Sequence, residues 1–175
     1  MTRETSIDLH FQEIDALISK WRVPSVKVAS KGVPPHITLL YPWRPTPITD
    51  TDLGILRSVI KGQHPFPIVF THLQQFSNRV LYLAVNEESN VRTLITKITN
   101  AFPEVLPYSG EFPNPIPHLT IAMAPDDATF EVLFQEVSAY IESELPIELI
   151  AREIVVMEEG EDTNWEVHSI IKLDD

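Results

Sequence analysis

The stretch Pro35-His36-Ile37-Thr38-Leu39 returns 82 residues later as Pro117-His118-Leu119-Thr120-Ile121. Each copy has the pattern Pro-His-apolar-Thr-apolar. The proline keeps the residue before it extended, and the apolar residues that follow are typical of a buried strand. Average residue usage predicts this pattern in only roughly one in a thousand chains of this length. Two copies therefore indicate a duplication or a shared function.

The two motifs offer the same pair of side chains to one side of a sheet. Side chains alternate between the faces of a strand, so His36 and Thr38 point the same way, roughly 6–7 Å apart, as do His118 and Thr120. If the two strands lie near each other, two imidazoles and two hydroxyls share one face. The pattern itself includes no carboxylate and no thiol.

The first half of the chain predicts strands and helices in alternation around its motif. Apolar residues at helical spacing, Ile14, Leu17, Ile18 and Trp21, predict a helix that Pro24 closes. The remaining elements expected in this half are strands at 5–11, 26–29 (a short edge strand) and 36–41, a helix from Thr49 to Gly62, and a hairpin of strands 66–76 and 80–85.

The second half repeats this order from the strand at 80–85. We expect a helix begun by Ser89 or Asn90, an irregular loop at 101–117 with five prolines, and the motif strand at 118–123. A helix from Asp126 or Asp127 to the break at Pro146, and strands at 147–157 and 165–173, complete the chain.

These patterns predict one domain of 175 residues with an α+β fold. The expected architecture is bilobal and pseudo-symmetric, with two mostly antiparallel sheets and outer helices around a central cleft. The duplicated halves cover approximately 1–85 and 80–175. We expect the two His-x-Thr strands to face the cleft.

Composition narrows the classes of protein to consider. No apolar run approaches the length of a membrane span, and the polar start has no signal-peptide pattern, so the sequence predicts a soluble, cytoplasmic protein without a membrane partner. The absence of cysteine excludes disulfides and thiolate chemistry. The sequence makes no prediction of oligomeric state.

The net charge of −12 argues against tracking along a long nucleic acid, which needs a basic footprint. The charge is uneven. Residues 1–79 carry nine Lys/Arg and six Asp/Glu, whereas residues 80–175 carry four and nineteen. A small phosphorylated ligand bound mainly by the first half is compatible with this distribution. The alternative is that the acidic half is simply a solvated surface.

A pair of histidines near neutral pH can hold one neutral and one protonated ring, because the unperturbed pKa is about 6.5. The neutral ring takes a proton from an attacking water while the imidazolium gives one to the departing oxygen. Threonine hydroxyls can stabilise charge on phosphate oxygens. Phosphodiester chemistry suits this set. A zinc site fits less well, because zinc usually needs three or four ligands and the motifs supply two histidines. A serine nucleophile also fits less well, because the sequence lacks the nucleophile-elbow motif. The remaining alternative is that both histidines are ordinary core residues without a chemical role.

The residues at 34–42 and 117–122 resemble the paired signatures of the two-histidine phosphoesterases, the superfamily of 2′-5′ RNA ligase-like proteins and cyclic phosphodiesterases. Phe102-Pro103 and Pro107-Tyr108 are similar to that family's approach to its second motif. The resemblance implies metal-independent catalysis without a cofactor, on 2′,3′-cyclic phosphates, 2′-5′ linkages or other small phosphodiesters of nucleotides or RNA ends. It implies His36 and His118 as the catalytic pair, with Thr38 and Thr120 binding phosphate, and ligation as a reverse reaction.

Other residues carry weaker signals. Tyr41, Trp43 and Tyr108 are candidates for stacking on a base, with core packing as the equal alternative. Arg44 and Lys31 flank the first motif and are candidates for holding phosphate or for solvated surface positions. The remaining histidines lack a threonine two residues later and are expected to be ordinary surface or core residues: His10, His64, His72 and His168.

The leading hypothesis is therefore a phosphodiesterase in which His118 acts as base toward water and His36 as acid toward the ribose oxygen. The runner-up is a module of the same fold that binds a nucleotide or phosphoryl ligand without turning it over. A structural interaction domain with an acidic face is the third alternative.

Overall fold

The computed structural model describes residues 3–112 and 114–174. Its strands are β1 (Thr5–His10), β2 (His36–Leu40), β3 (Phe66–Phe76), β4 (Val80–Val85), β5 (His118–Met123), β6 (Ile147–Ala151), β7 (Glu153–Glu159) and β8 (Trp165–Lys172). Its helices are α1 (Asp15–Ser25), α2 (Lys27–Ser30), α3 (Asp50–Ile60), α4 (Ser89–Ala101) and α5 (Asp127–Ile141), with 3-10 turns at Gln12–Ile14 and Pro107–Gly110. Within the described part of the chain, none of the helices has the length and apolar character that crossing a membrane requires.

The strands form one eight-stranded sheet in the order β6-β3-β4-β5-β2-β1-β7-β8, with antiparallel neighbours throughout. The expected α+β fold is confirmed. The two sheets that we expected correspond to the two four-stranded halves of this single sheet. The halves meet where β2 pairs with β5 at Ile37 and Leu119. Each half contains strands from both halves of the sequence, since β3 and β4 join β5 and β6, while β1 and β2 join β7 and β8.

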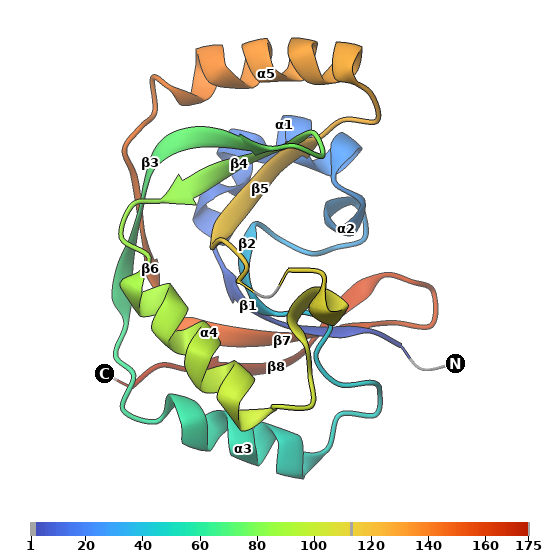
Figure 1. Ribbon diagram of the computed structural model, residues 1–175, viewed down its shortest axis with the longest axis vertical. Coiled ribbons are helices and arrows are strands. Elements are labelled where there is room, and N and C mark those ends of the chain that lie inside the picture. The colour runs from blue at the N-terminus through green and yellow to red at the C-terminus, as the bar shows by residue number, and fades with distance from the viewer. Residues whose placement is uncertain (1–2, 113, 175) are drawn as a thin grey trace.

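Helices pack against the sheet on both sides of this junction. α1 contacts β5, and α4 contacts β2 and α3, as Figure 1 shows. The apolar residues of the motif strands, Ile37, Leu39, Leu119 and Ile121, are buried in the core that these helices share. Because strand side chains alternate, the histidines and threonines of both motifs project from the opposite face of the sheet.

Helix starts follow local chemistry. Thr49 and Asp52 form a reciprocal capping box that begins α3, and the Asp126 carboxylate accepts the Thr129 N–H at the start of α5. α4 differs from expectation, because its N-cap is Glu88 and no side chain caps it. α1 runs one residue past Pro24, to Ser25.

Two expected strands are wrong in detail. Residues 26–29 do not form an edge strand, because the Ala29 N–H donates to the Val26 carbonyl and the segment closes as the one-turn helix α2 before Gly32 turns at a φ of 98°. The run at 147–157 is two strands separated at Arg152. β6 pairs with β3 and β7 with β1, so the chain crosses here from one half of the sheet to the other.

The Ile37–Leu119 junction generates a stability prediction. Leu119 is fully buried, so Leu119→Ala should lower the free energy of unfolding by about 2–5 kcal/mol through lost burial and a cavity. Urea unfolding followed by circular dichroism measures this loss. Val132→Ala on α5, where the side chain is 58% exposed, serves as control and should cost far less. Equal losses in both variants would contradict a packed junction.

Candidate active site

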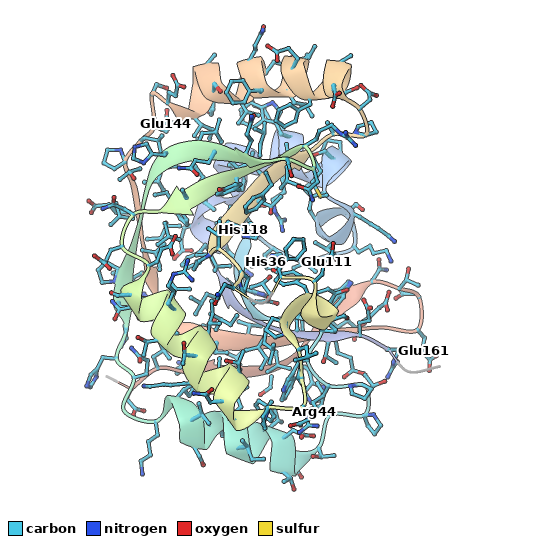
Figure 2. All side chains as sticks on the ribbon, in the orientation of Figure 1. His36, Arg44, Glu111, His118, Glu144 and Glu161 are labelled. Atoms are coloured by element: carbon cyan, nitrogen blue, oxygen red, sulfur yellow. The ribbon has the colours of Figure 1, made fainter. Side chains whose placement is uncertain are left out.

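The junction between β2 and β5 brings the two motifs together. Extending the Ile37–Leu119 register by one residue in each direction places His36 opposite Thr120 and Thr38 opposite His118. All four side chains share one face, and Figure 2 shows the two labelled histidines near the centre of the molecule. Diagonal neighbours in a regular sheet are roughly 7–8 Å apart, a separation at which two imidazoles can flank one phosphate.

Both histidines make the same hydrogen bond to the backbone. His36 Nδ1 lies 2.8 Å from the carbonyl oxygen of Pro34, and His118 Nδ1 lies 2.7 Å from that of Ile116, in each case two residues upstream. A carbonyl oxygen only accepts, so Nδ1 carries the proton in both rings. Arg22 Nη2 also lies 3.3 Å from His36 Nδ1, and in this tautomer the two nitrogens are neighbouring donors that share the Pro34 oxygen. The bond leaves Nε2 of each neutral ring with a free lone pair, as acid–base chemistry requires.

The first motif has polar, buried neighbours on β1. Antiparallel pairing sets Asp8 opposite Thr38 and His10 opposite His36, and the rings of His10 and His36 have centroids 6.3 Å apart. His10 Nε2 is 4.0 Å from Asp8 Oδ2. Burial, helped by the positive charges of His36 and Arg22, lowers the pKa of His10 to about 3. His10 is therefore neutral at ordinary pH, and the contact with Asp8 is not an ion pair.

Arg22 of α1 fixes the backbone just before the first motif. Its side chain is buried, with Nη1 donating to the Val33 carbonyl at 2.8 Å and Nη2 to the Pro34 carbonyl at 2.9 Å. The Pro34 oxygen thus accepts from both Arg22 and His36. Burial lowers the pKa of Arg22 to about 10, so the guanidinium stays charged at neutral pH. Arg22 orients the carbonyl that orients His36.

The second motif has aromatic neighbours instead. On β4, Tyr82 lies opposite Thr120 and Ala84 opposite His118. The His118 ring meets Phe76 edge-on at 5.0 Å and Tyr82 at 5.4 Å between centroids. Burial lowers the pKa of His118, and the charge of His36 lowers it further, while the bond to the Ile116 carbonyl acts in the opposite direction. His118 consequently favours the neutral form.

The loop before the second motif is hydrogen-bonded to the segment that follows the first motif. The Tyr108 N–H donates to the Tyr41 carbonyl at 2.6 Å, and the two rings are 6.1 Å apart. Tyr108 and Ser109 both have left-handed backbone angles, with φ of 49° and 55°, a costly conformation for residues with side chains. The Thr38 hydroxyl interacts with the Tyr108 hydroxyl and lowers its pKa, whereas burial raises it more. Tyr108 is therefore part of the same cluster as Thr38.

Residues 10–163 match the family model of the 2′-5′ RNA ligase superfamily. The chain belongs to this superfamily. The resemblance of its motifs to the two-histidine phosphoesterases is thereby confirmed, and membership supports a phosphoesterase or ligase-like activity.

Solved structures show the same fold. The chain is 14% identical to E. coli LigT in its complex with 3′-AMP, over 99% of both chains, with a TM-score of 0.61. It is 18% identical to the protein TT0787 of Thermus thermophilus, over 99% of this chain and 98% of that one, with a TM-score of 0.60. At these identities the likeness shows the fold alone. No curated protein sequence gives a significant match.

Some candidate residues of this superfamily member have structural roles. Trp43 is 3% exposed and packs edge-on against Phe102, with centroids 5.3 Å apart, so the interpretation as a base-stacking residue is replaced by core packing. Arg44 forms ion pairs with Asp52 and Glu104. In the same way, Lys31 pairs with Glu159 at 3.6 Å. The Tyr41 hydroxyl donates to Glu4 at 2.6 Å, and its ring packs beside Trp165.

Sequence reasoning missed Asp8, His10 and Arg22. His10 was expected to be an ordinary histidine, yet it lies next to His36. Alternation along β1 puts Asp8 and His10 on one face, and Arg22 falls four residues after Ile18 of the apolar stripe of α1. A charged residue on a buried stripe was the available signal. Among residues 3–112 and 114–174, no group of three or more His, Cys, Asp or Glu residues is placed to hold a metal ion.

The low pKa of His10 generates a prediction for stability. The unfolded chain binds a proton at His10 below about pH 6.5, whereas the folded chain does so only near pH 3, so the free energy of unfolding should rise with pH between these values. His10→Gln should flatten this rise. Thermal unfolding across pH 3–9 measures it, with pH 7–9 as the internal control. An unchanged slope between pH 3 and 6.5 would show that His10 titrates normally.

Proposed function

We propose that this protein is a metal-independent phosphodiesterase that acts on 2′,3′-cyclic phosphates or 2′-5′ linkages of nucleotides or RNA ends. The catalytic pair is His36 and His118. The observation that carries the proposal is the matched hydrogen bonding of the two rings, in which each Nδ1 donates to a backbone carbonyl and each Nε2 is left for proton transfer.

Hydrolysis of a cyclic phosphate uses the two rings in opposite roles. His118 is the base, because its pKa is lowered and its Nε2 is free to accept a proton from water. The resulting hydroxide oxygen bonds to phosphorus as the bond to one ribose oxygen breaks. His36, as imidazolium, donates its Nε2 proton to that oxygen. The product is a phosphomonoester. When an RNA hydroxyl takes the place of water in the same sequence, its oxygen bonds to phosphorus as the bond to one ribose oxygen breaks, and the product is a joined phosphodiester, which is ligation.

Hydroxyl groups supply the phosphate contacts. Thr38 and Thr120 are directly opposite the two histidines in register, which supports a role for their hydroxyls as donors to the non-bridging oxygens. Tyr108 lies next to Thr38, and burial raises the pKa of its phenol, which keeps it a donor at neutral pH. Tyr41 supports the Tyr108 loop and is the second aromatic candidate for a substrate contact.

A nucleotide ligand agrees with the bound molecules of a protein with the same fold. E. coli LigT has been crystallised with 3′-AMP, ATP and NADP+. The runner-up function, binding of such a ligand without turnover, is distinguished by experiment.

The first test is turnover of 2′,3′-cyclic nucleotides in EDTA between pH 5 and 9. His36→Ala and His118→Ala should each lower kcat roughly a hundredfold or more, since each removes a general acid or base. The exposed His64 provides the matched control, His64→Ala, which should retain full activity. Loss of activity in EDTA would contradict the metal-free mechanism. Binding without turnover, weakened by either catalytic substitution, would establish the binding module instead.

The packing of Phe76 and Tyr82 against the His118 ring generates a prediction for the pH dependence of activity. Phe76→Ala admits water to the ring, so the pKa of His118 should rise toward its ordinary value and the acidic limb of the kcat/KM profile should move to higher pH. The control is Phe130→Ala, which removes a half-buried aromatic ring on α5. An acidic limb that stays in place in Phe76→Ala, or moves equally in both variants, would contradict the assignment of His118 as base.

A further inference from the structure

The sheet face that carries the two motifs continues beyond His118 onto β4 and β3. Ala84 of β4 is the register partner of His118, and His72 of β3 is the register partner of Ala84. Figure 1 shows β3, β4 and β5 side by side. Because paired residues of neighbouring strands point to the same face, His118, Ala84 and His72 form one row across three strands, the His72 row.

Exposure differs on the two sides of the motifs. Ala84 is the one residue of β4 that is not buried, and His72 is exposed. On the other side, where β1 pairs with β2, the Asp8 side chain is 1% exposed and the His10 side chain 7%. The face is therefore covered beside the first motif and accessible beside the second.

The middle position of the His72 row has the small side chain that an accessible surface for a ligand needs. Neighbouring strands are about 4.8 Å apart, so the backbones that carry His118 and His72 are separated by roughly 9–10 Å. Only the methyl group of Ala84 projects between them. A ligand group of the size of a ribose can lie over this methyl group with an imidazole on either side.

Two polar side chains of β3 present defined hydrogen-bonding groups on this face. The Thr71 hydroxyl donates to Asn86 Oδ1 at 3.4 Å and lies 2.7 Å from His72 Nδ1. A hydroxyl has one hydrogen, so Nδ1 donates to it, and Nε2 of the neutral His72 ring is an acceptor. Gln74 Oε1 accepts from the Tyr82 hydroxyl at 3.1 Å, which leaves the N–H donors of the amide for a ligand.

The accessible side is the side at which the proposed reaction brings in its nucleophile. Entering and leaving oxygens lie roughly in line on opposite sides of phosphorus. In the proposed mechanism His36 serves the ribose oxygen that leaves, and His118 serves the oxygen that enters. The surface beyond His118 thus has room for an entering group larger than water. Its acceptor and amide donors match ribose hydroxyls and the edge of a base.

We propose that the His72 row is a binding subsite for a second nucleoside, the one that carries the 5′-oxygen on the His118 side of the phosphate. A ribose hydroxyl of this nucleoside donates to His72 Nε2, and its base accepts from the Gln74 amide. The inference rests on the proposed function and narrows its substrate class to diesters with a nucleoside on each side of phosphorus. The sequence predicted an ordinary role for His72, whereas this subsite makes it a specificity residue.

A 2′-5′-linked diadenosine monophosphate, 2′-5′ ApA, has this form. In its cleavage His36 takes the proton of the 3′-hydroxyl, whose oxygen bonds to phosphorus. The bond from phosphorus to the 5′-oxygen of the second adenosine breaks, and the His118 imidazolium gives that oxygen a proton. The products are adenosine 2′,3′-cyclic phosphate and adenosine, and the opposite direction is ligation.

The test compares 2′-5′ ApA with 2′,3′-cyclic AMP, which lacks the second nucleoside. His72→Ala removes the acceptor, and Ala84→Leu fills the space over the methyl group. The matched control is His64→Ala, because His64 is also an exposed histidine whose Nδ1 is hydrogen-bonded, in its case to the Asp174 carbonyl. Release of adenosine measures cleavage of 2′-5′ ApA, and release of AMP measures hydrolysis of the cyclic nucleotide.

His72→Ala should raise KM for 2′-5′ ApA roughly three- to tenfold, the effect of one lost hydrogen bond. Ala84→Leu should raise it roughly tenfold or more by steric exclusion. Neither variant should change KM for 2′,3′-cyclic AMP, and His64→Ala should change neither value. Equal changes for both substrates, or no change for 2′-5′ ApA in either variant, would overturn the proposal.

A modified substrate tests the contact itself. A 2′-5′ dinucleotide whose second nucleoside lacks both ribose hydroxyls should show the raised KM with the intact protein. His72→Ala should then have no further effect, because the two changes remove the same hydrogen bond. A full additional loss in His72→Ala would overturn the assignment of His72 as the acceptor.

Failure of the proposed function is separable from failure of this inference. Turnover of 2′,3′-cyclic AMP without cleavage or binding of 2′-5′ ApA would overturn the subsite and leave the proposed function standing. If the intact protein turns over neither substrate, calorimetric binding of 2′-5′ ApA replaces KM in the same comparison. Binding weakened by His72→Ala and Ala84→Leu and preserved in His64→Ala would support the subsite in a binding protein, whereas equal affinity in all variants would overturn it.

Discussion

The antiparallel pairing of β2 with β5 at Ile37 and Leu119 is the constraint on which the rest of the site depends. It joins the two halves of the sheet, and its register decides which side chains share a face. Since strands have a period of two, a slip of one residue would turn one histidine into the core and bring an isoleucine or leucine to the surface. The buried Ile37 and Leu119 prevent that slip, so the hydrophobic core fixes the geometry of the proposed catalytic residues.

The motifs are alike in backbone and unlike in surroundings. Each histidine donates from Nδ1 to a carbonyl two residues upstream, which supports our proposal that residues 1–175 form one domain of two related halves. The neighbouring strands then differ, because β1 brings Asp8 and His10 to the first motif and β4 brings Tyr82 and Ala84 to the second. Such a difference favours one ring as the acid and the other as the base, whereas two rings in identical surroundings would be interchangeable.

The sequence predicted the elements whose evidence is local. The two motif strands, the apolar stripe of α1, and the starts of α3 at Thr49 and of α5 at Asp126 or Asp127 were all expected at or near their observed positions. Features that depend on which strands pair with each other could not be predicted from the sequence. The run at 147–157 has no glycine, proline or other turn residue at Arg152, and nothing in its sequence shows that its two parts pair with different halves of the sheet. The same division applies to the site. Asp8 and His10 have no motif of their own, and they belong to it only because β1 pairs with β2 in one register. Trp43 follows the motif closely in sequence, yet the turn after β2 takes it into the core.

The charge of the protein is consistent with a site built from hydroxyls. Arg44 and Lys31, which flank the first motif, are paired with carboxylates, and Arg22 is directed to backbone carbonyls. In the proposed mechanism the phosphate contacts come from His36, the threonines and Tyr108, which are neutral or singly charged donors. Affinity for long nucleic acids depends on many Lys and Arg contacts with phosphates. A chain of net charge −12 in which, as we propose, hydroxyl donors bind one phosphate is suited to a small ligand or a chain end, which presents a single phosphate for recognition.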